Sequence, residues 1–325
     1  MAYDGSDFQG WQVQPGLPTI QGELQAALGR ITGETPLPQG SGRTDAGVHA
    51  LAQVASFALR APIPPENLHR ALNRTLPPSI RISEARTVRS TFHARHSAIS
   101  KTYEYRIFRA AICPPFLARY VYACPWTLDL DKLQACARLF EGEHDFQSFA
   151  ASDPDLSHRE LVSQQELVSE PQSSKSPYAP ESTSLKQRGP GHSPSHPQGF
   201  VKGHGFSHAV AAPQNEMGLQ PLPPTVRTIY CSSWELRPED AGQLLVYRVC
   251  GSGFLHHMVR NLAGTMIDVG RGQLALEEIP GILAARSRSA AGPTAPARGL
   301  FLHSVEYDDR DLLFAPESGC APSHI

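Results

Sequence analysis

The sequence predicts a mixed α/β (α+β) fold with two similar lobes. Helical and strand patterns alternate along the chain before residue 152 and again after residue 224. The length of 325 residues is enough for two domains, or for one large domain with an insertion. Between the two patterned halves, residues 152–224 are rich in proline and serine and show no such alternation.

The first half predicts two helices and three strands. Residues 19–33 carry isoleucine and leucine at helical spacing, and Thr19 is a residue type that caps helix N-termini. Pro64-Pro65 begins a second helix and Pro77-Pro78 ends it, because proline suits the first turn of a helix and not its interior. Strand patterns cover residues 53–59, 80–88 and 101–108.

The second half repeats this order of elements. A helical pattern runs from Leu130 through Phe140 and ends near Gly142. Further elements are strands over residues 226–236, 244–250 and 300–307, and helices over residues 254–269 and 282–286.

The composition of residues 152–224 predicts disorder for most of this segment. Its few apolar side chains cannot bury enough surface to offset the entropy lost on ordering. Its histidines, among them His192, His196, His204 and His208, lack carboxylate or thiol partners, so we expect no metal site there.

The overall charge gives no support for nucleic-acid binding, because 29 basic residues are matched by 31 acidic ones. Basic residues are enriched locally, however. Seven of them lie between Arg81 and Arg109, against Glu84 and Glu104. Such a stretch is compatible with phosphate contacts and equally with two ordinary solvated strands.

The six cysteines are scattered and form no C-x-x-C pair, which argues against a zinc ribbon or a redox dithiol. We therefore expect free thiols, mostly buried. No apolar run approaches the roughly 20 residues that a membrane-spanning helix needs. The N-terminus lacks the features of a secretory signal, so the expected compartment is the cytoplasm.

The most informative motif is residues 40–50, Gly-Ser-Gly-Arg-Thr-Asp-Ala-Gly-Val-His-Ala. Glycines on both sides of Asp45 permit unusual backbone conformations and the close approach of a ligand. Arg43 can hold a carboxylate ionised, or reach a phosphate or a base edge. Taken only as a glycine-rich polar stretch, the same residues would also suit a turn between strands.

This eleven-residue string resembles the catalytic loop of the TruA family of tRNA pseudouridine synthases. Further blocks similar to the family's motifs follow in the same order: residues 2–12, 91–98, 101–106, 142–146, 225–229, 254–261 and 297–302. The resemblance therefore covers nearly the whole chain except residues 152–224.

The resemblance implies that the chain isomerises uridine to pseudouridine at positions 38–40 of the tRNA anticodon stem-loop. The reaction breaks the glycosidic N–C bond, turns the uracil and rejoins it through carbon, without metal or cofactor. It needs a nucleophilic carboxylate and an apolar pocket that retains the detached base. The resemblance also implies a homodimer and two ferredoxin-like lobes whose sheets join into one extended mixed sheet, with the active site in the cleft between them.

By correspondence with the family, Asp45 is the expected nucleophile and Arg260 its ion-pair partner. Such a pair favours the ionised carboxylate and fixes its direction. On the predicted helix, Arg260 shares a polar face with His256, His257 and Gly264. The sequence leaves open whether Asp45 attacks the ribose carbon or the uracil ring.

Three further residues match the family's substrate-binding positions. Tyr103 is expected to stack on the extruded uracil, and its hydroxyl to help move the proton from carbon. Leu300 takes the position beneath the base. Arg43 is expected to hold the opened strand and to fill the vacated space. Tyr105, His49 and His93 are expected to have structural roles.

Two other classes of protein fit the sequence less well. An RNA-binding protein on the same fold, without catalysis, would not need an aspartate facing an anionic ligand. An aspartate-dependent hydrolase fits poorly, since a phosphatase of this kind needs a second aspartate at the position of Gly47. An aspartic protease would need two Asp-Thr/Ser-Gly loops.

The expected organisation is an N-terminal catalytic lobe at residues 1–109 and a C-terminal lobe at residues 110–310. Residues 152–224 interrupt the second lobe, and residues 311–325 form a flexible tail. The family's usual strand residues before Ala2-Tyr3 are missing here, so either the first strand is truncated or the true start lies upstream.

Overall fold

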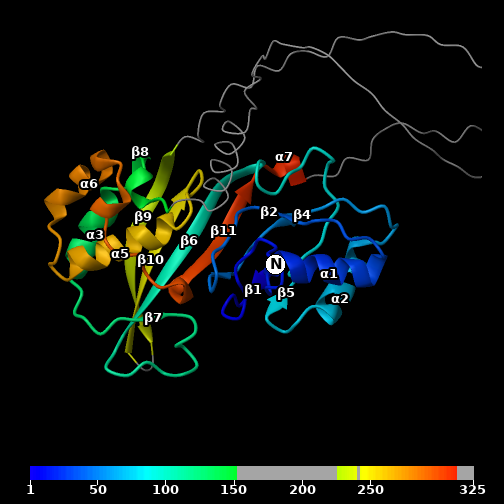
Figure 1. Cartoon of the computed structure of the whole chain (residues 1–325), viewed down its shortest axis with the longest axis horizontal. Coiled ribbons are helices and arrows are strands. Elements are labelled where there is room, and N and C mark those ends of the chain that lie inside the picture. Colours follow the sequence, from blue (N-terminus) through cyan, green and yellow to red (C-terminus); the bar gives the residue numbers. More distant parts are fainter. Residues whose placement is uncertain (152–224, 240–241, 313–325) are drawn as a thin grey trace, which may run out of the picture. The chain divides into compact units, whose positions relative to one another are not determined.

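A computed structural model describes residues 1–151, 225–239 and 242–312 of the chain (Figure 1). The predictions made for residues 152–224, and for the tail beyond residue 312, lie outside these described residues. Within them, no helix is both long and apolar enough to cross a bilayer.

A large mixed sheet forms the centre of the described structure. Its strands are β1 (Ala2–Tyr3), β3 (His49–Ala50), β5 (Ile80–Arg81), β6 (Ala98–Arg109), β7 (Tyr122–Ala123), β8 (Gly142–Asp145), β9 (Val226–Glu239), β10 (Gly242–Gly251) and β11 (Leu300–Tyr307). They are ordered β5-β1-β3-β11-β6-β10-β9-β8, and β7 pairs with β6. The β3–β11 and β6–β7 pairs are parallel and the other pairs are antiparallel. A separate ribbon joins β2 (Gln39–Gly40) to β4 (Ala55–Ser56).

Helices flank this sheet in two groups (Figure 1). Near β1 and β5 lie α1 (Ile20–Thr32) and α2 (Pro65–Thr75), which contact each other. Near β8, β9 and β10 lie α3 (Leu130–Arg138), α5 (Met258–Gly270) and α6 (Ile279–Ala285). A last short helix is α7 (Asp309–Leu312), and 3-10 turns span η1 (Gln147–Phe149), η2 (Leu276–Glu278), η3 (Arg288–Ala290) and η4 (Ala297–Gly299). The predicted mixed α/β class is confirmed.

Helix α1 shows why the sequence folds locally as predicted. The Thr19 hydroxyl accepts a hydrogen bond from the Gly22 N–H at 3.3 Å, which caps the N-terminus. Gly33 ends the helix with φ of 76°, a left-handed conformation that glycine adopts without strain. The apolar face buries Leu24 and Leu28 in the core.

Four of the predicted strands are confirmed, but two others are much shorter than predicted. The patterns at residues 53–59 and 80–88 give only the two-residue strands β4 and β5. The partner of each, β2 or β1, is itself only two residues long, so neither ladder extends further.

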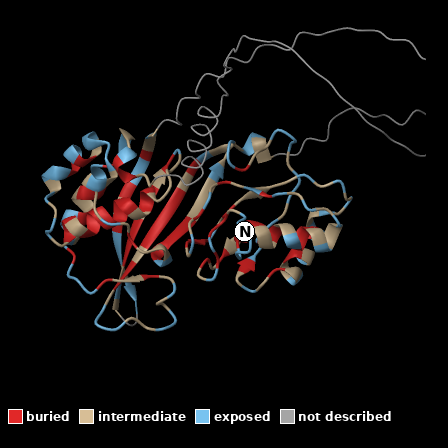
Figure 2. Cartoon of the chain, viewed as in Figure 1, coloured by how far each residue is buried: buried red, intermediate tan, exposed pale blue. Residues whose placement is uncertain are grey.

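Helix α5 begins at Met258, four residues later than the pattern predicts. The residue before it, His257, has φ of 60° and therefore lies outside helical conformation. Nearly all of α5 beyond Arg260 is buried, because it packs between α3 and the face of β6. Figure 2 shows buried residues concentrated on the long strands and on the helices that cover them. This packing fixes where the start of α5 lies.

The described cysteines are free thiols, as predicted. Their burial differs from the prediction, since Cys124 and Cys136 are buried but Cys231 is exposed. Cys231 lies opposite Cys250 on neighbouring strands β9 and β10.

Candidate active site

The loop that carries Asp45 connects β2 to β3 and is held by the segment before α1. The Trp11 N–H donates to the Thr44 carbonyl at 2.9 Å, and the Gly47 N–H donates to the Phe8 carbonyl at 3.2 Å. Gly10 makes this approach possible, because a Cβ atom there would lie 2.6 Å from the Thr44 oxygen. The motif at residues 2–12 thus supports the motif at residues 40–50.

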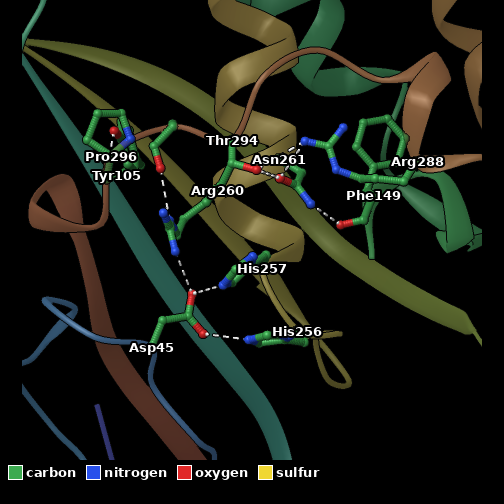
Figure 3. Close-up of polar contacts among 11 residues, drawn as sticks. Asp45, Tyr105, Phe149, His256, His257, Arg260, Asn261, Arg288, Thr294 and Pro296 are labelled. Carbon is green, nitrogen blue, oxygen red and sulfur yellow. Dashed lines mark hydrogen bonds and ion pairs between the residues drawn. The ribbon is translucent and has the colours of Figure 1, made fainter. Parts of the chain in front are cut away.

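Asp45 and Arg260 form the predicted ion pair, although 215 positions separate them in the sequence (Figure 3). The Arg260 Nη1 atom lies 3.0 Å from Asp45 Oδ2, and both side chains are largely buried, with 15% and 17% exposed. The Arg260 Nε donates to the Ala295 carbonyl at 2.9 Å. The guanidinium is therefore fixed at both ends, and it fixes the direction of the carboxylate.

His256 and His257 approach the same carboxylate from the start of α5 (Figure 3). The His256 Nε2 lies 3.5 Å from Asp45 Oδ1, and the His257 Nε2 lies 3.4 Å from Oδ2. Burial lowers the pKa of His257, against the opposing effect of Asp45. The sequence pattern predicts both histidines on a helical face with Arg260. In the structure the left-handed turn at His257, and not helical spacing, brings them there.

Asp45, His256 and His257 carry donor atoms within 4.8 Å of one another, which is the donor set of a possible metal site. The guanidinium of Arg260 contacts the same carboxylate, however. A second cation at this carboxylate would be repelled by the first. The arrangement therefore favours an oriented aspartate over a metal ligand.

Tyr103 lies beside this loop on β6. Its side chain is 7% exposed, and its ring meets the Phe254 ring edge-on with centroids 5.1 Å apart. A Cβ atom on Gly42 would lie 3.7 Å from the Tyr103 hydroxyl. Burial raises the pKa of Tyr103, helped by the nearby Tyr3 and Asp45. The phenol is therefore neutral at physiological pH.

The other predicted substrate-binding residues lie on adjacent elements. Arg43 is exposed on the Asp45 loop, and Leu300 is buried at the first position of β11, opposite Tyr105 in the ladder. The Tyr105 hydroxyl donates to the Pro296 carbonyl at 2.9 Å, which is the predicted structural role. His49 is also structural, because it is buried, stacks on Phe301 and contacts the Arg119 carbonyl at 3.1 Å.

Sequence reasoning missed the group of residues that anchors α5 behind Arg260. The buried Asn261 donates to the Phe149 carbonyl at 2.7 Å and accepts from Thr294 at 2.6 Å and from Arg288 at 3.1 Å (Figure 3). The position of Asn261 directly after Arg260 was the available signal. The partners come from distant parts of the chain, so the sequence could not reveal them.

This combination of a mixed sheet, a glycine-flanked aspartate and an arginine bound to it from a helix places the chain in a known class. A family model described as tRNA pseudouridine synthase matches residues 1–97 and 201–308, and the chain belongs to this family.

Curated relatives agree over almost their whole length. The tRNA pseudouridine synthase A of Solibacter usitatus is 45% identical over 308 residues, which cover 94% of this chain and 97% of the relative. The protein of the same name from Moorella thermoacetica is 38% identical over 309 residues, with coverage of 94% and 97%. That of Bacillus pumilus is 33% identical over 311 residues, with coverage of 95% and 98%.

Proposed function

We propose that this protein isomerises uridine to pseudouridine in tRNA, at positions 38–40 of the anticodon stem-loop, with Asp45 as nucleophile. Family membership supports the reaction and the tRNA substrate. The resemblance of the loop at residues 40–50 to the TruA catalytic loop supports the stem-loop positions. The observation that carries the role of Asp45 is its contact with the Arg260 guanidinium at 3.0 Å.

In the proposed reaction, the Asp45 carboxylate forms a transient covalent bond with the target nucleoside, at the ribose carbon or at the uracil ring. The glycosidic N–C bond breaks, the uracil turns, and a C–C bond to the ribose forms. The proton lost from the ring carbon is balanced by the proton that the freed ring nitrogen gains. Tyr103, which lies beside the loop, assists this proton transfer.

The uridine must leave its stack to reach Asp45, which costs a few kcal/mol. We assign Tyr103 to stacking on the uracil and Leu300 to the surface beneath the base. Arg43 is exposed on the same loop and would hold the opened strand. A homodimer in the cytoplasm is part of the proposal, and light scattering of the purified chain tests the dimer.

The decisive experiment incubates an anticodon stem-loop transcript with the wild-type protein and with Asp45→Asn, and then maps pseudouridine. We expect product with the wild type and a loss of about 10³-fold or more with Asp45→Asn, since a nucleophile has no substitute. Asp131→Asn is the matched control, because Asp131 is exposed on α3. Product formation by Asp45→Asn at the wild-type rate would remove Asp45 from the mechanism. RNA binding without product from the wild type would favour a binding protein.

A further inference from the structure

Three cationic side chains influence one another electrostatically, and one of them, Lys101, lies beside Tyr103; the proposed reaction does not use them. Arg95 lies in the loop before β6, Lys101 lies on β6, and Arg227 lies on β9. Each of the three pairs interacts electrostatically: Lys101 with Arg95, Lys101 with Arg227, and Arg227 with Arg95. We call these residues the Lys101 cluster.

The cluster adjoins the candidate active site. Lys101 precedes Tyr103 by two positions on β6, so both side chains lie on the same face of the strand. A Cβ atom on Gly42 would lie 4.0 Å from the Lys101 Nζ and 3.7 Å from the Tyr103 hydroxyl. The ammonium group therefore reaches the same loop that carries Asp45.

The Lys101 ammonium has like charges around it and no counter-charge among the residues that the structure describes. It is half-buried, and the charged groups that influence it there are Arg95 and Arg227. Burial, together with these two guanidinium groups, lowers the pKa of Lys101 to about 8. Burying the Lys101 ammonium among like charges costs free energy in the unbound protein, and a bound anion would offset that cost.

The surroundings of the cluster suit a phosphodiester. Gly42 and Gly253 border it without side chains, and a Cβ atom on Gly253 would lie 3.7 Å from the Arg227 Nε. Arginine offers a planar pair of donors for phosphate oxygens, and lysine adds a point charge.

Building on the proposed function, we propose that Arg95, Lys101 and Arg227 bind one phosphodiester of the RNA strand, adjacent to the nucleoside that enters the Asp45 site. This contact positions the flipped nucleoside without reading its base.

The test measures RNA affinity for the wild type, Lys101→Met and Lys132→Met, by fluorescence anisotropy over a range of salt concentrations. The ligands are anticodon stem-loop RNAs in which one phosphodiester at a time is replaced by a neutral methylphosphonate. Lys132 is exposed on α3 and provides the matched control. We expect Lys101→Met to weaken binding about tenfold and to reduce the slope of log Kd against log salt by about 1. Lys132→Met should change neither.

The phosphodiester itself is identified by comparing the effect of each methylphosphonate on the wild type with its effect on Lys101→Met. At one position flanking the target uridine, methylphosphonate should weaken wild-type binding about tenfold and leave binding by Lys101→Met unchanged. Additive effects at every position, or equal salt slopes for the two variants, would overturn the proposal. A third outcome would also overturn it: methylphosphonate changes the RNA affinity at no position, while inorganic phosphate raises the Tm of the wild type but not of Lys101→Met. The cluster would then be a site for small anions.

The affinity measurement separates this inference from the proposed function. If the methylphosphonate effect depends on Lys101 but no pseudouridine forms, the phosphodiester subsite is supported and the isomerase is refuted. Pseudouridine formed without such a dependence at any position would refute the subsite alone.

Discussion

The Arg260 guanidinium joins the nucleophile to the scaffold through two hydrogen bonds in different directions. Its Nη1 contacts Asp45, and its Nε contacts the carbonyl of Ala295. A lysine in its place would have one compact donor group instead of a planar fork and could not reproduce both bonds. The orientation of the carboxylate thus depends on the loop that follows α6 as well as on α5 itself.

Replacing Lys101 is predicted to stabilise the folded protein, whereas most substitutions of buried residues destabilise it. The pKa of Lys101 is lowered from 10.5 to about 8, so at pH 7 the folded protein contains a protonated ammonium that is disfavoured relative to the unfolded chain. Lys101→Met keeps the apolar stem and removes the charge. We expect the Tm at pH 7 to rise by about 2 °C or more.

The pH dependence follows from the same shift. Between about pH 8 and pH 10.5 the folded wild type has already lost the proton that the unfolded chain still binds, so wild-type stability rises with pH in this window. The Tm advantage of Lys101→Met should therefore be constant below about pH 8 and shrink as the pH approaches 10.5. Thermal unfolding scans across this range measure it. A lower Tm for the variant at pH 7 would contradict the unfavourable placement of the ammonium.

The site residues differ in how far the sequence predicts them. Motif resemblance gave Asp45 and Arg260 together, and their contact is present in the structure. The basic stretch from Arg81 to Arg109 included Arg95 and Lys101. Arg227 joins them only because β10 lies between β6 and β9, which brings distant residues near one another. The turn at His257 was also hidden, since non-glycine residues rarely take positive φ.

Helix α5 depends on a close backbone approach at Gly264. A Cβ atom there would lie 1.7 Å from the Pro293 carbonyl oxygen, and this backbone leads directly to Ala295, the partner of Arg260. Gly264→Ala must push the loop or the helix aside. We expect the free energy of unfolding to fall by about 1–3 kcal/mol and the isomerase activity to fall with it.

The control for Gly264→Ala is the same substitution at Gly281 on α6, where a Cβ atom would meet nothing within 4 Å. Gly281→Ala should leave the stability unchanged or raise it slightly, because alanine loses less backbone entropy than glycine on folding into a helix. Urea unfolding of both variants makes the comparison. Equal stabilities would show that the loop yields at Gly264 without cost.

The sequence predicts an element well where its own side chains determine it. Helix α1 has its cap, its apolar face and its terminal glycine within the segment, and β11 (Leu300–Tyr307) matches its predicted range. The short strands β4 and β5 were overpredicted because alternation within a segment says nothing about the length of its partner. Strand length is a property of the pair.

At the scale of the whole described structure, the sheet joins the start of the chain to its end. Strand β6 from the first half lies between β10 and β11, both from the second half. The fragment 1–151 would leave β6 without either long neighbour and its apolar side chains without α5. We predict that this fragment shows no cooperative thermal unfolding by circular dichroism, whereas the full chain does. A sharp transition for the fragment would mean that the first half folds alone.

The fold class followed from the alternation of helices and strands, and the sheet confirms it. The strand order did not follow, because the parallel pairing of β3 with β11 joins segments that are far apart in sequence. Such pairings depend on packing over the entire domain, and local propensity does not encode them. The roles predicted for Tyr103, Leu300 and Arg43 remain predictions, which assays of substrate turnover can test.

The β3–β11 pair also bears on how a cell makes this protein. Strand β3 ends at Ala50 and β11 ends at Tyr307, so roughly 250 further residues must be translated before the ladder can close. At ordinary ribosomal speeds that delay is on the order of tens of seconds. Throughout it, the nascent chain exposes an unpaired strand edge next to the future nucleophile, and such edges attract other chains. Chaperone protection during synthesis should therefore matter more for this enzyme than for one whose strands all pair with near neighbours in the sequence.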